Sequence, residues 1–143
     1  MRKGLIALLA LIAFSAAAVA QTYMPTIPPG AVPIAATSGN VANATAAAAF
    51  SAVDGQRNYL CGYSIRSLGA TTAGTVAITS SGMASNLNHS YFTVAGAGIQ
   101  NQPMDIVFEP CMVGLTSTAI FVSLAALGAG NTNAFINIWG YRY

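Results

Sequence analysis

The chain has 143 residues, of which 55% are hydrophobic and only 6% are charged, and its formal net charge is +2. Two of its five basic residues, Arg2 and Lys3, stand at the start. After them, three arginines balance three carboxylates and no lysine occurs, so the chain lacks the basic surface that nucleic-acid binding requires. We therefore expect no nucleic-acid partner.

Residues 1–20 have the pattern of a signal peptide. A basic start is followed by an apolar run from Leu5 to Phe14 and by the cleavage-site pattern Ala18-Val19-Ala20. An uncleaved membrane anchor is the alternative, but the uncharged stretch is at the short edge of the ~20 residues that span a bilayer. We predict cleavage before Gln21 and hence a secreted, periplasmic or cell-surface protein, with location in a virion as the alternative.

Residues 21–37 form a proline-rich segment, whose prolines exclude a helix or an interior strand. These prolines are Pro25, Pro28, Pro29 and Pro33. The segment is also apolar, whereas free linkers are usually polar. Its apolar residues include Tyr23, Met24, Ile27 and Val32. We predict an extended arm that packs onto its own domain or onto a neighbouring copy.

From residue 38 onward, short segments with strand character are separated by turn signals. The expected strands are Val41–Val53, Arg57–Ser67, Thr75–Thr79, Tyr91–Val94, Met104–Glu109 (ended by Pro110), Thr118–Leu127 and Ala134–Tyr143. Only the first is ambiguous, because the run Ala46–Ala49 has high helix propensity but lacks the apolar spacing of an amphipathic helix. The pattern predicts an all-β sandwich or jelly roll over residues 38–143, with about seven to eight short antiparallel strands.

Two segments carry a period of two. In Tyr59–Ile65 the odd positions are large or sulfur-bearing, which predicts a half-buried strand that carries Cys61. The last segment is apolar on both sides, so we expect it to be covered on both, on one of them by another subunit. Ile136 and Ile138 face one way, and Phe135, Trp139, Tyr141 and Tyr143 face the other.

Cys61 and Cys111 are the only cysteines, and behind an export signal they most simply pair with each other. Such a bond would close a loop of about 50 residues and contribute roughly 4 kcal/mol. Free buried thiols, bonds between subunits and a metal site are the alternatives. Two cysteines so far apart, with one histidine in the chain, lack a recognisable ligand spacing, so we predict no metal and no cofactor.

The chain has few candidates for catalysis. His89 is the only histidine, and we expect it to be solvated in a polar loop over residues 80–90. Asp105 and Glu109 are four residues apart on one predicted strand, about 13 Å at the strand rise. That separation exceeds the ~5–9.5 Å of glycosidase carboxylate pairs. We therefore predict no catalytic residues and a protein that is not an enzyme.

Aromatic residues are the remaining candidates for a site. They are Tyr59, Tyr63, Trp139, Tyr141 and Tyr143. One interpretation places them in the core or in a subunit interface, since aromatic residues dominate both. The other makes them an exposed platform on which sugar rings stack.

The turn Ser38-Gly39-Asn40-Val41-Ala42-Asn43, the strand Tyr63-Ser64-Ile65 and the turn Gly69–Gly74 resemble the start of small phage and prophage β-proteins. The turn Leu127–Asn133, running into Trp139-Gly140-Tyr141, is similar to their C-terminal strand. The likeness covers roughly residues 38–143. It implies a jelly-roll-like virion protein of the kind that decorates heads or builds fibres, often as trimers. The export signal and the cysteine pair are additions to that pattern.

The sequence thus leads to two functional hypotheses. The first is a non-enzymatic structural protein that self-associates, with a trimer as the expected oligomer and a capsid or surface assembly as its partner. The second is a secreted carbohydrate-binding or adhesin-like module that holds a glycan through its aromatic residues.

Overall fold

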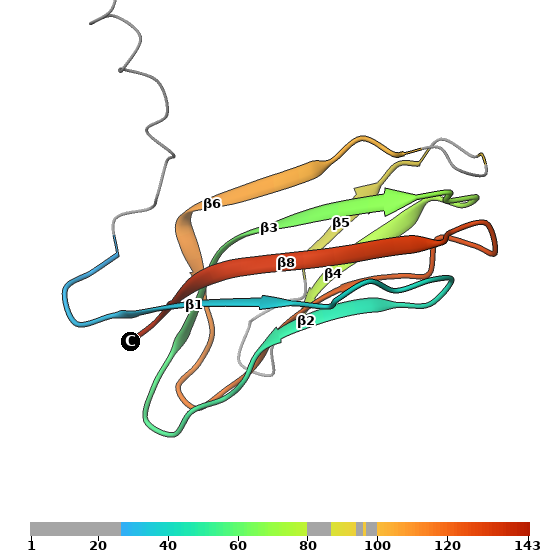
Figure 1. The fold of residues 1–143 in the computed structure, drawn as a ribbon. Coiled ribbons are helices and arrows are strands. Elements are labelled where there is room, and N and C mark those ends of the chain that lie inside the picture. Colours follow the sequence, from blue (N-terminus) through green and yellow to red (C-terminus); the bar gives the residue numbers. More distant parts are fainter. Residues whose placement is uncertain (1–26, 80–86, 94–95, 97–99) are drawn as a thin grey trace, which may run out of the picture.

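The computed structural model describes residues 27–79, 87–93, 96 and 100–143. Within these residues the chain is all-β, with eight strands in two antiparallel sheets that face each other (Figure 1). The strands are β1 (Val32–Thr37), β2 (Ala46–Phe50), β3 (Asn58–Leu68), β4 (Gly74–Thr79), β5 (Leu87–Tyr91), β6 (Met104–Val113), β7 (Ile120–Leu124) and β8 (Asn133–Arg142). The predicted β-sandwich is confirmed.

Each sheet takes strands from both halves of the chain. One sheet has the order β1-β8-β3-β6, and the other has the order β2-β7-β4-β5. We call them the β3 sheet and the β4 sheet. β1 pairs with β8 from Val32↔Arg142 to Thr37↔Asn137, so the first and last strands lie side by side.

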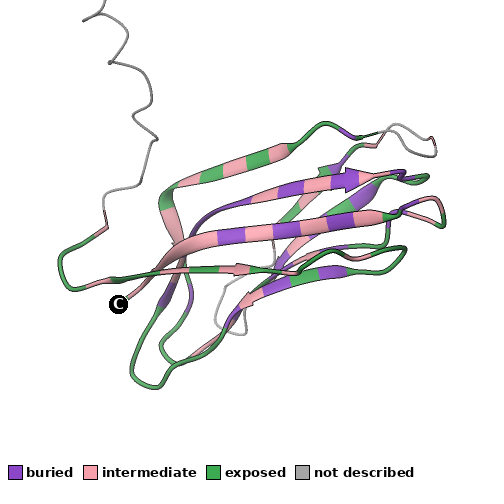
Figure 2. Cartoon of the chain, in the orientation of Figure 1, coloured by how far each residue is buried: buried purple, intermediate pink, exposed green. Residues whose placement is uncertain are grey.

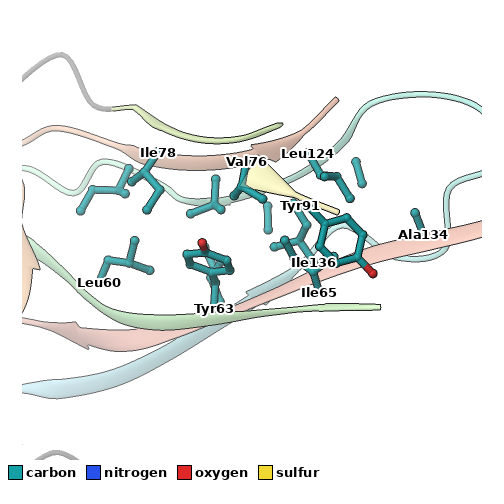
Figure 3. Packing of buried hydrophobic residues seen from close by; sticks show 14 of the residues in the cluster. Leu60, Tyr63, Ile65, Val76, Ile78, Tyr91, Leu124, Ala134 and Ile136 are labelled. Carbon is teal, nitrogen blue, oxygen red and sulfur yellow. The ribbon is translucent and has the colours of Figure 1, made fainter. Parts of the chain in front are cut away.

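The core lies between the two sheets, where alternate residues of each strand point inward (Figures 2 and 3). Its large, fully buried side chains are Leu60, Tyr63, Ile65, Val76, Ile78, Ile120, Val122, Leu124, Leu127, Ile136 and Ile138. Burial of each aliphatic side chain stabilises the fold by roughly 1.5–3 kcal/mol. Ile136 and Ile138 both point inward, so the prediction that they share one face is confirmed.

The alanine-rich segment forms a strand. β2 pairs with β7 over its whole length. Ala46, Ala48 and Phe50 are buried and Ala47 is exposed, as a period of two requires. The predicted strand is confirmed over this shorter range, because burial and pairing with β7 outweigh the helix propensity of alanine.

A β-bulge interrupts β3 at Cys61. On one side of it Leu60 pairs with Met112, and on the other side Gly62 pairs with Val107. On the β8 side, Leu60 pairs with Gly140 and Gly62 pairs with Trp139, so Cys61 is one extra residue of β3 relative to β8. An extra residue of this kind shifts the alternation of side chains along the strand.

The bulge decides which residues of β3 point into the core. Leu60, Tyr63 and Ile65 are fully buried, whereas Tyr59 lies on the outward side. The expectation that the odd positions from Tyr59 to Ile65 share one face is therefore wrong. The period of two holds on each side of the bulge but not across it.

The proline-rich segment supplies the first strand of the sandwich. Residues 32–37 are paired with β8, so the sandwich starts before residue 38 and the last six residues of the predicted arm form a strand. Residues 21–26 of that arm, like the predicted signal peptide over residues 1–20, lie outside the described residues. Pro33 is tolerated because β1 is an edge strand. We call the remaining part of the segment, residues 21–31, the arm.

Two further strand boundaries differ from the prediction. β6 continues through Pro110 to Val113, because it is an edge strand in which a proline costs no interior ladder bond. β5 occupies the end of the segment expected to be a polar loop, and the rest of that segment, residues 80–86, lies outside the described residues. The strand expected over Tyr91–Val94 is confirmed only at Tyr91, and Val94 also lies outside the described residues.

Asn58 connects three strand ends at one end of the sandwich. Its side chain is buried, and its Nδ2 donates to the carbonyl oxygens of Ser51 (3.0 Å) and Thr118 (2.9 Å). Its Oδ1 accepts from Nε of Arg142 (3.0 Å). Ser51 follows β2, Thr118 precedes β7 and Arg142 ends β8, so one amide joins strands of both sheets.

We expect Asn58→Ala to lower the free energy of unfolding by about 2–4 kcal/mol, because each buried partner left unpaired costs roughly 1–3 kcal/mol. Chemical denaturation followed by circular dichroism measures the change. Ser64→Ala, on the outward side of the same strand, is the control and should change it by less than about 0.5 kcal/mol. Equal effects of the two substitutions would contradict the role of the amide.

Candidate functional site

The outward side of the β3 sheet carries three of the five aromatic residues singled out in the sequence. In the register of β3 and β8, Tyr59 lies beside Tyr141, and Trp139 is two residues away on the same side of β8. The edge strand β6 adds Val107 and Val113 to this surface. We call these five residues the aromatic face.

Tyr59 and Tyr141 stack on each other. Their ring centroids are 4.5 Å apart and their planes differ by 14°. A ring pair of this kind contributes roughly 0.5–1.5 kcal/mol beyond the area it buries. Burial raises the pKa of the Tyr141 hydroxyl above its ordinary value, and the electrostatic interaction with neighbouring Tyr59 raises this pKa further. The stack fixes the position of one end of the aromatic face.

The indole of Trp139 lies close to the sheet because the residue beneath it is a glycine. A Cβ on Gly62 would overlap the Cζ2 atom of the indole and would lie 2.5 Å from the carbonyl oxygen of Ile106. The indole therefore passes directly above the backbone of β3. Only glycine leaves room for this close contact.

We expect Gly62→Ala to displace the indole and lower the free energy of unfolding by about 1–3 kcal/mol, as overpacking does. Trp139 is the only tryptophan of the chain, so its fluorescence reports the displacement directly. Ser64→Ala, the next outward position of β3, is the control and should leave the emission unchanged. An unchanged emission for Gly62→Ala would mean that the indole does not rest on this glycine.

The aromatic face is apolar and partly open to solvent. Val107 is 51% exposed and Val113 is 44% exposed, while Tyr59, Trp139 and Tyr141 are half-buried. Figure 2 shows the alternation of exposed and half-buried residues along β6. Exposed apolar side chains that share one surface indicate a place where another molecule or chain segment binds.

The other end of the same surface is polar. Arg66 and Asp105 form an ion pair (3.2 Å) whose side chains are 34% and 54% exposed, so it contributes less than about 1 kcal/mol. A hollow of about 190 Å³ adjoins it, smaller than the ~300–1,000 Å³ of typical small-molecule sites. It is lined by Arg66, Ser67, Leu68, Gln100, Asn133 and Phe135.

Tyr63 lies on the opposite side of the sheet from the aromatic face. Its side chain is fully buried, and a hydrogen bond joins its Oη to Nδ1 of His89 (2.5 Å). The ring of Phe108 is 6.0 Å from the ring of Tyr63. Tyr63 is thus a core residue and cannot stack on a sugar.

His89 corrects a second expectation. It lies in strand β5, half-buried against Tyr63, and not in a solvated loop. The sequence around His89 is polar and lacks an apolar strand pattern, because β5 is an edge strand with two of its five residues exposed. With its Nδ1 held by a tyrosine hydroxyl, His89 has the role of a structural residue.

Burial raises the pKa of Tyr63 to about 12, against about 10 in an unfolded chain. The unfolded chain therefore loses this proton first as the pH rises, and the contribution to stability disappears between pH ~10 and ~12. We expect the free energy of unfolding of Tyr63→Phe to fall less steeply across this range than that of the unmodified protein. Phe121→Leu, an exposed substitution that removes no titrating group, should retain the original slope, and a slope for Tyr63→Phe equal to that of the control would contradict the assignment.

Tyr143 lies at the end of the chain, beyond the stacked tyrosines. Its side chain is 62% exposed, and its backbone exchanges two hydrogen bonds with Arg57. A Cβ on Gly30 would lie 3.6 Å from its Cε2 atom. Tyr143 is therefore next to the arm and outside the aromatic face as defined above.

A disulfide joins Cys61 and Cys111, the only cysteines of the chain. It connects β3 to β6 at the bulge, where Leu60↔Met112 and Gly62↔Val107 are the flanking pairs. The predicted intrachain pairing is confirmed, which leaves no thiol for a metal or for a bond between subunits. Disulfides are typical of oxidising compartments outside the cytoplasm.

Carboxylates and metal ligands do not gather within the described residues. Asp105 pairs with Arg66, and Asp54 accepts a hydrogen bond from the Ser117 hydroxyl (3.2 Å). Nowhere in the described part of the chain do three histidine, cysteine or acidic side chains come together as metal ligands would. In the same part of the chain, no helix has the length and apolar character needed to cross a membrane.

Sequence reasoning identified the aromatic residues but missed their neighbours. The outward position of Val107 follows from the alternation that puts Met104, Ile106 and Phe108 on the inward side, so a signal was present. The role of Gly62 had no such signal, because it depends on the register between β3 and β8.

Comparison with known proteins adds no relative to this picture. No protein family, no curated protein and no solved structure has a significant match to this chain.

Proposed function

We propose that this protein is a non-enzymatic structural component of an extracellular or virion assembly, and that its copies associate through the aromatic face. The observation that carries this proposal is the group of aromatic and aliphatic side chains on the outward side of the β3 sheet, with Val107 half-exposed. Tryptophan and tyrosine are enriched in protein interfaces, where charged residues are depleted.

The low charge of the chain supports the same conclusion. Only 6% of all residues are charged, against ~25% in ordinary globular proteins. Isolated proteins usually stay soluble by carrying a net charge, whereas a component of an assembly covers much of its surface. The resemblance of residues 38–143 to small virion proteins is in keeping with this role and makes a trimer the expected oligomer.

A carbohydrate-binding module is the second candidate. It is favoured by the position of Trp139, whose indole rests on Gly62 and is half-exposed. An aromatic ring that lies against a sheet presents its other side to a sugar ring. Arg66 and Asp105, at the other end of the same surface, would supply hydrogen bonds to hydroxyl groups.

Two matched substitutions test the proposed assembly. Val107→Asp places a charge on the aromatic face, and Phe121→Asp places one on the outward side of the β4 sheet. The two side chains are similarly exposed, at 51% and 48%. We expect the unmodified protein and Phe121→Asp to be oligomers in size-exclusion chromatography with light scattering, and Val107→Asp to be a monomer. Trp139→Ala should also dissociate the oligomer.

A strict monomer at all concentrations would contradict the proposed assembly. If such a monomer is retained on a polysaccharide column and the Trp139→Ala variant is not, carbohydrate binding replaces assembly as the proposed function. Circular dichroism and the absence of free thiols show in each case that the variant is folded.

A further inference from the structure

The hollow at the polar end of the β3 sheet has the features of a small binding site. It lies where β3 ends and β8 begins, at the right-hand end of the sandwich in Figure 1. Phe135 lies beside Arg66 in the register of these two strands. Asn133 and Gln100 flank Leu68 on its two sides. We propose that this hollow binds one neutral sugar ring, at a site separate from the aromatic face.

The hollow and the aromatic face are too far apart to share one ring. Phe135 and Trp139 are four residues apart on β8, which is about 13 Å at the strand rise. A single ring in the hollow therefore does not reach the indole. The inference does not rest on the proposed assembly, and it differs from the carbohydrate-binding candidate above, in which the sugar lies on Trp139.

The size of the hollow limits the ligand. Its volume of about 190 Å³ is the space of roughly six water molecules at ~30 Å³ each. Sites that enclose drug-sized molecules are larger, at ~300–1,000 Å³. One six-membered ring with its hydroxyl groups fits this space, whereas a nucleotide or a peptide segment does not.

Polar groups around the hollow have hydrogen-bonding capacity to spare. The Oδ1 atom of Asn133 is buried and has no partner among the described residues. Arg66 donates from Nη1 and Nη2 to the Ile65 carbonyl oxygen and to Asp105, which leaves its Nε–H unpaired in the described part of the chain. The side chain of Gln100 is exposed. A buried acceptor without a donor is unfavourable, so a ligand that donates to it gains affinity.

These groups require a ligand that both donates and accepts hydrogen bonds. The Oδ1 atom of Asn133 needs a donor, whereas Arg66 is a donor only and needs an acceptor. A hydroxyl group serves both, but a carboxylate or a phosphate only accepts. Asp105, with its side chain 54% exposed, neutralises Arg66 and repels an anion. The hollow therefore favours a neutral ligand with hydroxyl groups over an acidic one.

The apolar wall of the hollow favours a ring over an open-chain polyol. Phe135 and Leu68 line the hollow, and both are half-buried. The C–H groups of a sugar ring form an apolar surface that packs against an aromatic ring, while its hydroxyl groups extend toward polar neighbours. An apolar wall with a few polar groups is the usual composition of a ligand site.

Titration of the isotope-labelled protein, followed by NMR, tests the site. The probes are the methyl glycosides of glucose, galactose and mannose, with methyl glucuronide as the acidic control and glycerol as the acyclic one. We expect at least one neutral glycoside to bind saturably and to shift the backbone amides of Asn133, Phe135 and Gln100. The glucuronide should bind severalfold more weakly, and glycerol should not saturate. Absence of saturable binding of all three neutral glycosides would overturn the inference.

Two aromatic substitutions on β8 locate the bound sugar. Phe135 and Trp139 are both half-buried on the outward side of this strand. Phe135→Ala should weaken binding of the neutral glycoside beyond detection, and Trp139→Ala should leave it unchanged. Loss of binding with Trp139→Ala, alone or together with Phe135→Ala, would overturn the inference. Loss with Trp139→Ala alone would support the carbohydrate-binding candidate instead.

Asp105→Asn tests the electrostatic part of the inference. The ion pair is exposed and weak, so the variant should fold normally. It leaves Arg66 as an uncompensated cation at the hollow, so this variant should bind the glucuronide more tightly than the neutral glycoside. An unchanged preference for the neutral glycoside would show that Arg66 does not contact the ligand, which contradicts the proposed site.

The site and the assembly fail in different ways. Binding of a neutral glycoside that depends on Phe135, by a protein that is a strict monomer, would support the site and contradict the assembly. An oligomer that binds none of the three neutral glycosides would leave the assembly in place and overturn the site.

Discussion

The bulge at Cys61 decides which side chains of β3 point into the core and which point outward. One extra residue in β3 turns Tyr63 into the core while Tyr59 stays outward, and it places Gly62 beneath the indole of Trp139. The disulfide to Cys111 spans the same point, so the irregular part of the β3–β6 pairing is the part that is covalently closed. Without the bulge, a regular period of two would place Tyr59 and Tyr63 on the same side of the sheet.

The two sides of the β3 sheet differ in chemistry. The inward side is filled by aliphatic residues and by Tyr63, whose hydroxyl is satisfied by His89, so burial costs no unpaired polar group. The outward side combines stacked tyrosines, an indole and exposed valines with a weak ion pair at one end. Exposure of these apolar side chains to water is unfavourable in free energy. Binding of another surface removes the side chains from water and is favoured for that reason.

Much of the fold follows from the local sequence pattern. Alternation and turn residues were enough to predict the sandwich and the residues of β7 and β8 that share a face, because both depend on residues close in sequence. The pairing of the two cysteines followed from there being a single possible partner for each. The other features depend on contacts between residues far apart in the sequence. The bulge arises from the register between β3 and β8, the strand at His89 exists because β4 pairs with it, and β1 joins the sheet because β8 offers a free edge. The aromatic face has the same origin: its residues come from three strands, and only the pairing of those strands brings Tyr59, Trp139 and Val107 to one surface.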